Sequence, residues 1–183
     1  MKKIVVIAAA LFIATCFVSG LAAYAGEKNS SALSATLAGM RVLDTIKDRN
    51  DLPKGKKYLS LKMKLACAGN TPLSFPLNSV TLKTSKGERC ELIGIGSGAL
   101  EFDGFNVYLP FSAPWHPFSM TYEGENGKKL FGMKQKSKDD LPELSLLAQD
   151  QVMLIGFVVP ANATAFSLSV GPAINIKVTL KGL

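Results

Sequence analysis

Aromatic side chains and carboxylates are concentrated in the middle of the chain, where they could hold a ligand. Seven of the fifteen aromatic residues lie between Phe102 and Tyr122. Carboxylates flank this segment at Glu101, Asp103, Glu123 and Glu125. Aromatic rings beside carboxylates bind sugars or peptides in many proteins. We predict that a ligand contacts Tyr108, Trp115, His116, Phe118 and Tyr122, with Trp115 as the anchor. The competing interpretation is that these rings pack the segment onto the domain and fill its core.

No catalytic or metal-binding motif accompanies these rings. His116 is the only histidine of the chain, whereas a zinc site normally needs several His or Cys ligands. The glycines of 94–98 have neither the dinucleotide-binding nor the P-loop spacing, which favours a glycine-rich strand end. The sequence therefore predicts no catalytic residue, no metal and no cofactor. The alternative is a glycan-active enzyme, in which two of the four carboxylates converge beside Trp115 as acid and nucleophile or base.

Lysines follow the aromatic segment closely. Five of them, with no acidic residue among them, occur at Lys128, Lys129, Lys134, Lys136 and Lys138. Most such runs are solvated loops, and a site for anionic lipids or another polyanion is the lesser hypothesis.

The N-terminus predicts export. Lys2 and Lys3 precede an almost wholly apolar run, which ends in Ala23-Tyr24-Ala25 with small residues where a signal peptidase reads. We predict a signal peptide over 1–25 and a periplasmic or secreted protein. One alternative is an uncleaved segment that anchors the chain in the inner membrane, which would be its only membrane contact. Another is lipidation at Cys16, where Ile13-Ala14-Thr15-Cys16 half resembles a lipobox.

Removal of 1–25 leaves 158 of the 183 residues. That length suits one domain, 26–183, with a core large enough to need no disulfide scaffold. Loss of Lys2 and Lys3 reduces the formal net charge from +7 to +5. Such a mild basic excess, in an exported chain, excludes nucleic acid as the expected partner.

Strand patterns dominate the rest of the chain. The clearest is Lys57 to Ala68, where Leu59, Leu61 and Met63 belong to a period-two series that predicts a buried face. About seven strands, joined by Gly, Pro and Asn turns, are predicted near 34–46, 57–68, 80–84, 90–94, 152–159, 166–170 and 174–180. This pattern is typical of an all-β antiparallel β-sandwich. The only helical candidate is 140–148, with Asp140 as cap and Pro142 in the first turn.

The strand and turn pattern resembles a known family. Tyr58–Cys67 followed by Ala68-Gly69-Asn70-Thr71-Pro72-Leu73, Val80-Thr81-Leu82 with Ser85-Lys86-Gly87, and Val152 to Pro160 together look like bacterial extracytoplasmic immunoglobulin-like domains. The immunoprotective extracellular protein typifies this family of secreted proteins and lipoproteins. The resemblance implies an immunoglobulin-like sandwich and adds little about activity. Two parts of the chain depart from it: Gln149-Asp150-Gln151 replaces a Gly-containing turn, and the aromatic-rich segment of about 97–139 is an insertion.

Two cysteines of the mature chain allow a structural hypothesis. Cys67 and Cys90 each share the inward face of a strand with a leucine, and an oxidising compartment favours a disulfide. Two buried free thiols are the equal alternative, because sequence does not give the distance between them.

These features together predict an exported, non-catalytic binding or interaction module of the bacterial envelope. Its partner would be an unknown protein, peptide or glycan. A structural or envelope-assembly subunit is a further alternative, and it would expose a long edge strand or a large apolar patch.

Overall fold

The computed structural model describes residues 33–47, 52–67, 72–110, 116–124, 127–171 and 174–180. In these ranges every paired strand is antiparallel and no α-helix occurs; a 3-10 turn, η1, spans Leu77–Ser79. The strands are β1 (Leu33–Leu43), β2 (Lys56–Cys67), β3 (Leu73–Pro76), β4 (Thr81–Thr84), β5 (Arg89–Ser97), β6 (Val107–Tyr108), β7 (Phe118–Glu123), β8 (Lys129–Gln135), β9 (Glu143–Leu146), β10 (Asp150–Pro160), β11 (Ala165–Val170) and β12 (Ile174–Thr179). The all-β antiparallel prediction is confirmed.

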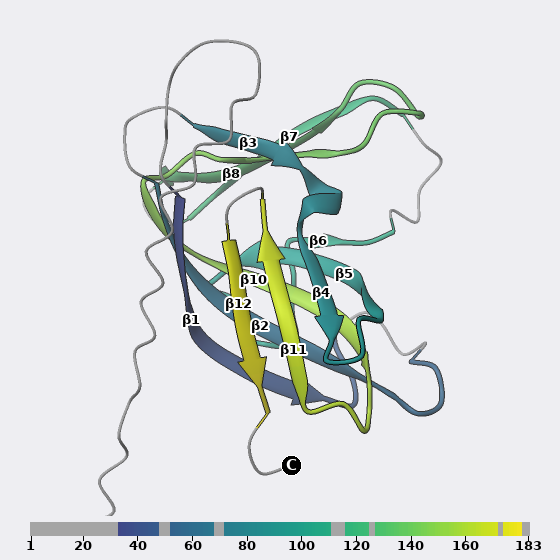
Figure 1. Cartoon of the computed structure of the whole chain (residues 1–183). Coiled ribbons are helices and arrows are strands. Elements are labelled where there is room, and N and C mark those ends of the chain that lie inside the picture. Colours follow the sequence, from purple (N-terminus) through teal and green to yellow (C-terminus); the bar gives the residue numbers. More distant parts are fainter. Residues whose placement is uncertain are drawn as a thin grey trace, which may run out of the picture.

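The seven strands predicted from sequence form one continuous main sheet. Its order is β1-β2-β10-β5-β4-β11-β12, and β6 adds to β5 outside this path. The sheet curls so far that β12 lies beside β1, although no hydrogen-bonded ladder joins these two strands in the described residues (Figure 1). The predicted strands therefore do not divide between two facing sheets.

A second, four-stranded sheet, the end sheet, crosses one end of the curled main sheet (Figure 1). Its order is β3-β9-β8-β7, and the sequence predicted none of these strands. The helical prediction for 140–148 is wrong, because β9 occupies Glu143–Leu146. Leu144 and Leu146 are both buried and pair with Met133 and Phe131 of β8. Burial of these two leucines against β8 outweighs the local capping signals of Asp140 and Pro142.

The main core fills the space inside the curled sheet and under the end sheet. Leu59, Leu61 and Met63 of β2 are fully buried there, as their alternation predicts. Phe131 and Leu144 of the end sheet belong to the same cluster. Since full burial of such a side chain contributes about 1.5–3 kcal/mol, the end sheet stabilises the fold as part of the core.

A smaller apolar cluster covers the outer face of the main sheet. Phe105, in the loop before β6, packs there with Tyr58 and Ile93. Gly94 and Gly156 are directly paired across β5 and β10, and the ring of Phe105 lies over both of them. Glycine is needed at both positions because a Cβ would collide with that ring. The outer face of β2 is consequently buried at Tyr58 as well.

A β-bulge changes the register within β5. Leu92 pairs with Phe157 of β10 and Gly94 pairs with Gly156, so Ile93 has no opposite residue. Cys90 and Leu92 face the interior, as predicted, but beyond the bulge Ile95 takes the inward position instead of Gly94. The extra residue bends β5 and brings Gly94 under Phe105.

Candidate functional site

A pocket opens where β4 and β5 separate. The two strands pair only at Leu82–Cys90 and Lys83–Arg89. Beyond this point β4 stays beside β11, while β5 continues beside β10. The space between them is a pocket of about 400 Å³, which we call the β4–β5 pocket. Its volume lies within the range of roughly 300–1,000 Å³ that is usual for small-molecule sites.

The floor of the pocket is apolar and comes from several parts of the chain. Leu77, Val80, Cys90 and Leu109 are each at least nine-tenths buried. The remaining lining residues are Asn78, Arg89, Glu91, Leu92, Leu141 and Pro142. Backbone hydrogen bonds fix two walls: the N–H of Leu77 donates to the carbonyl of Pro142 at 2.7 Å, and that of Leu109 donates to Ile93 at 2.8 Å.

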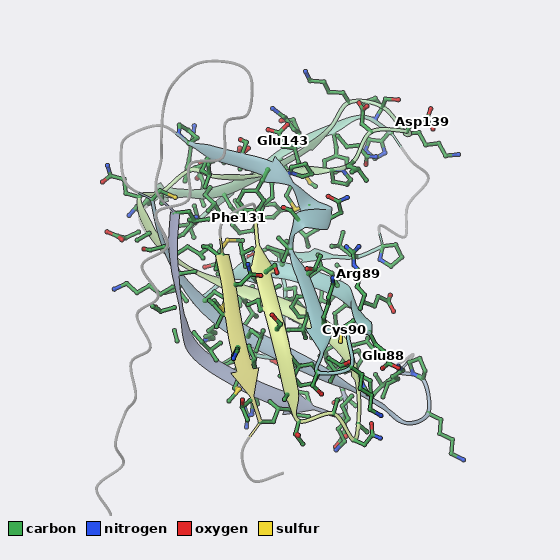
Figure 2. The ribbon with its side chains drawn as sticks, in the orientation of Figure 1. Glu88, Arg89, Cys90, Phe131, Asp139 and Glu143 are labelled. Atoms are coloured by element: carbon green, nitrogen blue, oxygen red, sulfur yellow. The ribbon has the colours of Figure 1, made fainter. Side chains whose placement is uncertain are left out.

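Polar groups are few and lie near the mouth. Nη2 of Arg89 donates to the backbone carbonyl of Asn78 at 3.1 Å, which holds the guanidinium beside the opening. Figure 2 shows Arg89 and Cys90 next to each other on β5, with Glu88 in the preceding turn. Leu141 is 56% exposed and is the most exposed of the lining leucines. The pocket thus combines an apolar floor with one anchored cation.

The Cys90 thiol is suited to packing and not to nucleophilic attack. Burial raises the pKa of this thiol; the positive charge of Lys56 opposes the shift, and the negative charge of Glu88 adds to it. The thiol therefore remains protonated at neutral pH, whereas the reactive form of cysteine is the thiolate. In the pocket Cys90 acts as a small, weakly polar floor residue.

The structure separates the aromatic residues that were predicted to bind a ligand. Tyr108 lies on the outer face of the main sheet, edge-on to Phe105 at 5.7 Å between ring centroids. Phe118 and Tyr122 are on β7 of the end sheet and pack against the main core. Tyr122 stacks on the buried ring of Phe131 at 4.7 Å. These three rings do not form one platform.

Trp115 lies outside the described residues, so its role as the anchor stays a prediction. His116 is exposed just before β7. Tyr108 directly precedes Leu109, which lines the pocket. Of the predicted binding residues in the described ranges, Tyr108 alone is the sequence neighbour of a lining residue. Phe105, in contrast, is 8% exposed, as the competing interpretation of core packing expects for these rings.

The flanking carboxylates also lie on different elements. Glu101 and Asp103 belong to the loop between β5 and β6, where the carbonyl of Asp103 accepts the N–H of Lys47 at 2.7 Å. Glu123 ends β7 on the end sheet, and Glu125 is outside the described residues. Within the described ranges, no three His, Cys, Asp or Glu side chains come together to hold a metal ion.

The structure does not show the disulfide: Cys67 and Cys90 are free in it, as in the alternative of two free thiols. Cys67 is the last residue of β2. Cys90 lies near the opposite end, because its neighbour Glu91 pairs with Val158 of β10, and Val158 also pairs with Tyr58 near the start of β2. The two cysteines are therefore separated by most of the length of β2, roughly 30 Å at about 3.3 Å a residue. A disulfide requires Cα atoms within about 7 Å of each other.

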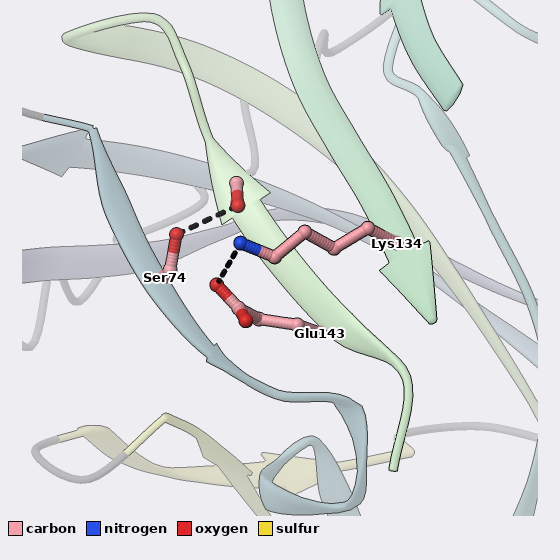
Figure 3. Close-up of polar contacts among 4 residues, drawn as sticks. Ser74, Lys134 and Glu143 are labelled. Carbon is pink, nitrogen blue, oxygen red and sulfur yellow. Dashed lines mark hydrogen bonds and ion pairs between the residues drawn. The ribbon is translucent and has the colours of Figure 1, made fainter. Parts of the chain in front are cut away.

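The lysines after the aromatic segment do not form one patch. Lys128 and Lys129 lie at the start of β8, whereas Lys136 and Lys138 follow its end. Lys134 pairs with Glu143 at 3.2 Å on the outer face of the end sheet, where the hydroxyls of Ser74 and Ser145 also meet at 2.6 Å (Figure 3). Lys128, Lys136 and Lys138 lie outside strands, as the interpretation of solvated loops expects, whereas Lys129 and Lys134 lie on β8 itself.

The predictions for residues 1–25, including Cys16, concern residues outside the described ranges. Among the residues that are described, no helix has the length and apolar character that crossing a membrane requires. No protein-family model, curated protein or solved structure matches the chain.

Sequence reasoning missed the pocket because its lining comes from segments far apart in the chain. The inward direction of Cys90 was the part that strand periodicity could predict. A second available signal was Leu141, a lone leucine after the polar run 134–140. The separation of β4 from β5, which creates the space, depends on how each strand pairs elsewhere.

Proposed function

We propose that this protein is an exported, non-catalytic binding module that holds a small apolar molecule in the β4–β5 pocket. The observation that carries the proposal is an open pocket of about 400 Å³ whose floor is built from buried apolar side chains. A pocket with an apolar floor and a few polar groups is the default candidate for a ligand-binding site.

The expected affinity is modest. Apolar burial contributes about 25 cal/mol per Å², so the small apolar area of this open pocket limits the gain. Hydrogen bonding to Arg89 adds to this gain, while lost translational and rotational freedom subtracts from it.

Two further observations support binding over chemistry. Cys90 is the one cysteine among the lining residues, and its raised pKa keeps the thiol in the protonated, less nucleophilic form at neutral pH. Glu101 and Glu123, two carboxylates of the alternative glycan-active site, belong to a main-sheet loop and the end sheet respectively.

The fold family and the compartment belong to the same proposal. The resemblance to bacterial extracytoplasmic immunoglobulin-like domains and the apolar start of the chain both support export. The single curled sheet is a departure from an immunoglobulin-like sandwich. Intact-mass measurement on protein exported by a bacterial host should give a chain that begins at Gly26. A mass that retains Met1, or that carries diacylglycerol on Cys16, would contradict periplasmic or secreted release.

Binding can be measured with the uncharged fluorescent probe N-phenyl-1-naphthylamine. Its emission should rise when it enters the pocket, and Leu141→Glu should weaken binding at least tenfold because it places a charge at an apolar mouth. Met40→Glu is the matched control, since Met40 is 38% exposed on β1 and does not line the pocket.

Alkylation of the floor cysteine gives an independent readout. Iodoacetamide should modify Cys90 more slowly when the probe is bound, while modification of Cys67, outside the pocket, should not change. Equal probe binding by Leu141→Glu and Met40→Glu, together with no protection of Cys90, would refute the proposed pocket function.

A further inference from the structure

Three basic side chains form a row across the outer face of the main sheet. Arg89 on β5 pairs with Lys83 on β4, Lys83 pairs with Ser167 on β11, and Ser167 pairs with Lys177 on β12. All four side chains are exposed. At about 4.8 Å between neighbouring strands, this cation row spans roughly 14 Å from Arg89 to Lys177.

The charges of the row have no partners among the described residues. Neither Lys83 nor Lys177 forms an ion pair there, and Arg89 makes only its hydrogen bond to the carbonyl of Asn78. Like charges that face each other directly across two strands, as Lys83 and Arg89 do, destabilise a sheet. The fold therefore keeps an unfavourable arrangement that an external anion would relieve.

The surroundings of the row are polar and nearly without acidic residues. Outward-facing neighbours on the same strands are Thr81, Ser169, Asn175 and Thr179. The hydroxyl of Ser169 contacts the side-chain oxygen of Asn175 at 2.5 Å. On the described strands β4, β5, β11 and β12 and in the β4–β5 turn, the carboxylates are Glu88 in the turn and Glu91 beside the pocket, both at the β5 end. Lys83 and Lys177 are thus left as the uncompensated part of the face.

We propose that the cation row docks the protein onto the phosphate headgroups of an anionic phospholipid surface. Three charges in a line on an open sheet face suit an extended array of anions, because nothing in this face encloses a single ion. Leu141, more than half exposed, lies with Arg89 at the mouth of the β4–β5 pocket and adds an apolar contact beside the charges. This combination distinguishes a lipid surface from a purely ionic polymer.

Docking does not depend on the proposed pocket function, although Arg89 belongs to both. The double variant Lys83→Gln/Lys177→Gln alters the row and leaves every pocket residue unchanged. It should bind N-phenyl-1-naphthylamine as the unmodified protein does and bind anionic vesicles roughly twenty-fivefold more weakly. Failure of one proposal can therefore be told from failure of the other.

The test is flotation of the exported protein with vesicles. Vesicles of phosphatidylglycerol mixed with phosphatidylcholine should bind it at low salt and release it at high salt, and vesicles of phosphatidylcholine alone should not bind it. Each Lys or Arg near an anionic surface contributes about fivefold in affinity. The row variant carries Lys83→Gln, Arg89→Gln and Lys177→Gln. It should therefore bind the anionic vesicles roughly one hundredfold more weakly than the unmodified protein does.

A control variant lowers the net charge by the same three units on the end sheet and its loops. It carries Lys129→Gln, Lys136→Gln and Lys138→Gln, all at exposed positions. The control should keep most of the affinity, and thermal unfolding should show both variants folded.

Three results would overturn the proposal. Equal losses in the row and control variants would show a general effect of net charge. Equal binding to both kinds of vesicle would show that anionic headgroups are not recognised. Binding to heparin without binding to phosphatidylglycerol would replace the lipid surface with a soluble polyanion.

Discussion

The contact between Phe105 and the paired glycines of β5 and β10 predicts that Gly156→Ala destabilises the protein, although Gly→Ala within a strand normally stabilises it. A Cβ at Gly156 would overlap Cζ of Phe105 and come within 2.8 Å of Cε1. Carbon atoms in favourable contact are about 3.5–4.0 Å apart, so the ring would have to move by about 1 Å. Phe105 is only 8% exposed and packs against Tyr58 and Ile93, which leaves the ring little space to move.

The magnitude follows from two opposed terms. Overpacking of this kind costs about 1–3 kcal/mol, while Gly→Ala inside a strand returns about 0.5–1 kcal/mol. Gly156→Ala should therefore lower the free energy of unfolding by about 1.5 kcal/mol. Phe105→Ala should lower it by about 3 kcal/mol, since most of the ring is buried.

The double variant tests the reasoning. Once Phe105→Ala has removed the ring, the added methyl group meets no obstacle, and Gly156→Ala should then stabilise by about 0.5 kcal/mol. The coupling energy between the two positions is thus about −2 kcal/mol. Gly104→Ala serves as the control, because a Cβ there meets nothing within 4 Å and should change stability by less than about 0.5 kcal/mol.

Urea unfolding measures all four variants, and thermal unfolding provides a second measurement. For a domain of this size 1 kcal/mol corresponds to about 2–4 °C in Tm, so Gly156→Ala alone should lower Tm by about 5 °C. Strictly additive effects of Gly156→Ala and Phe105→Ala would show that the ring does not lie over the glycine pair.

Three further predictions concern thiols, pH and a buried amide. The unfolded, unreduced protein should titrate with free thiols at Cys67 and Cys90, and a fall in Tm on reduction would instead indicate a bridge. Burial raises the pKa values of Cys67, Cys90 and Tyr122 above their ordinary 9.0 and 10.0. As pH rises, the unfolded chain loses these protons before the folded protein does, so the free energy of unfolding should be constant below about pH 9 and fall above it. The fall should be smaller in Cys90→Ala. A urea midpoint that does not change across this pH range would contradict the reasoning. The side chain of Gln151 is 6% exposed, and neither of its amide atoms has a hydrogen bond. Gln151→Met should therefore raise the free energy of unfolding by about 1 kcal/mol, seen as a higher urea midpoint. Gln135→Met, the control, should lower it, because Nε2 of Gln135 donates to the carbonyl of Asp140 at 2.7 Å; a lower midpoint for Gln151→Met would refute the argument.

Strand periodicity was enough to predict the seven strands that form the main sheet. The alternation along Leu59, Leu61 and Met63 survives in the structure because one face of β2 lies against a continuous core. Ile174 and Val178 alternate in the same way on β12. Such segments are predictable because side-chain direction in a strand repeats every two residues whatever the strand pairs with.

Strand order and the candidate site were not predictable in this way. Whether seven strands divide between two sheets or follow one another around a single curl depends on pairings between distant segments. Strand β9 of the end sheet was missed because local capping signals at Asp140 and Pro142 obscured the period-two pattern of Leu144 and Leu146. The pocket depends on the point at which β4 leaves β5, and alternation within either strand carries no information about that point.

The meeting of β1 with β12 has a consequence for behaviour in concentrated solution. An exposed sheet edge is a template on which a second copy of a chain can add strands, and sequences usually protect such edges with charges or prolines. Here the two edges of the main sheet lie beside each other without a ladder, so each obstructs access to the other. Protection by proximity is reversible: if β1 moves away, both edges become available together. Self-association should therefore follow local opening at this seam, and amide exchange in β1 and β12 should report that risk earlier than global unfolding does.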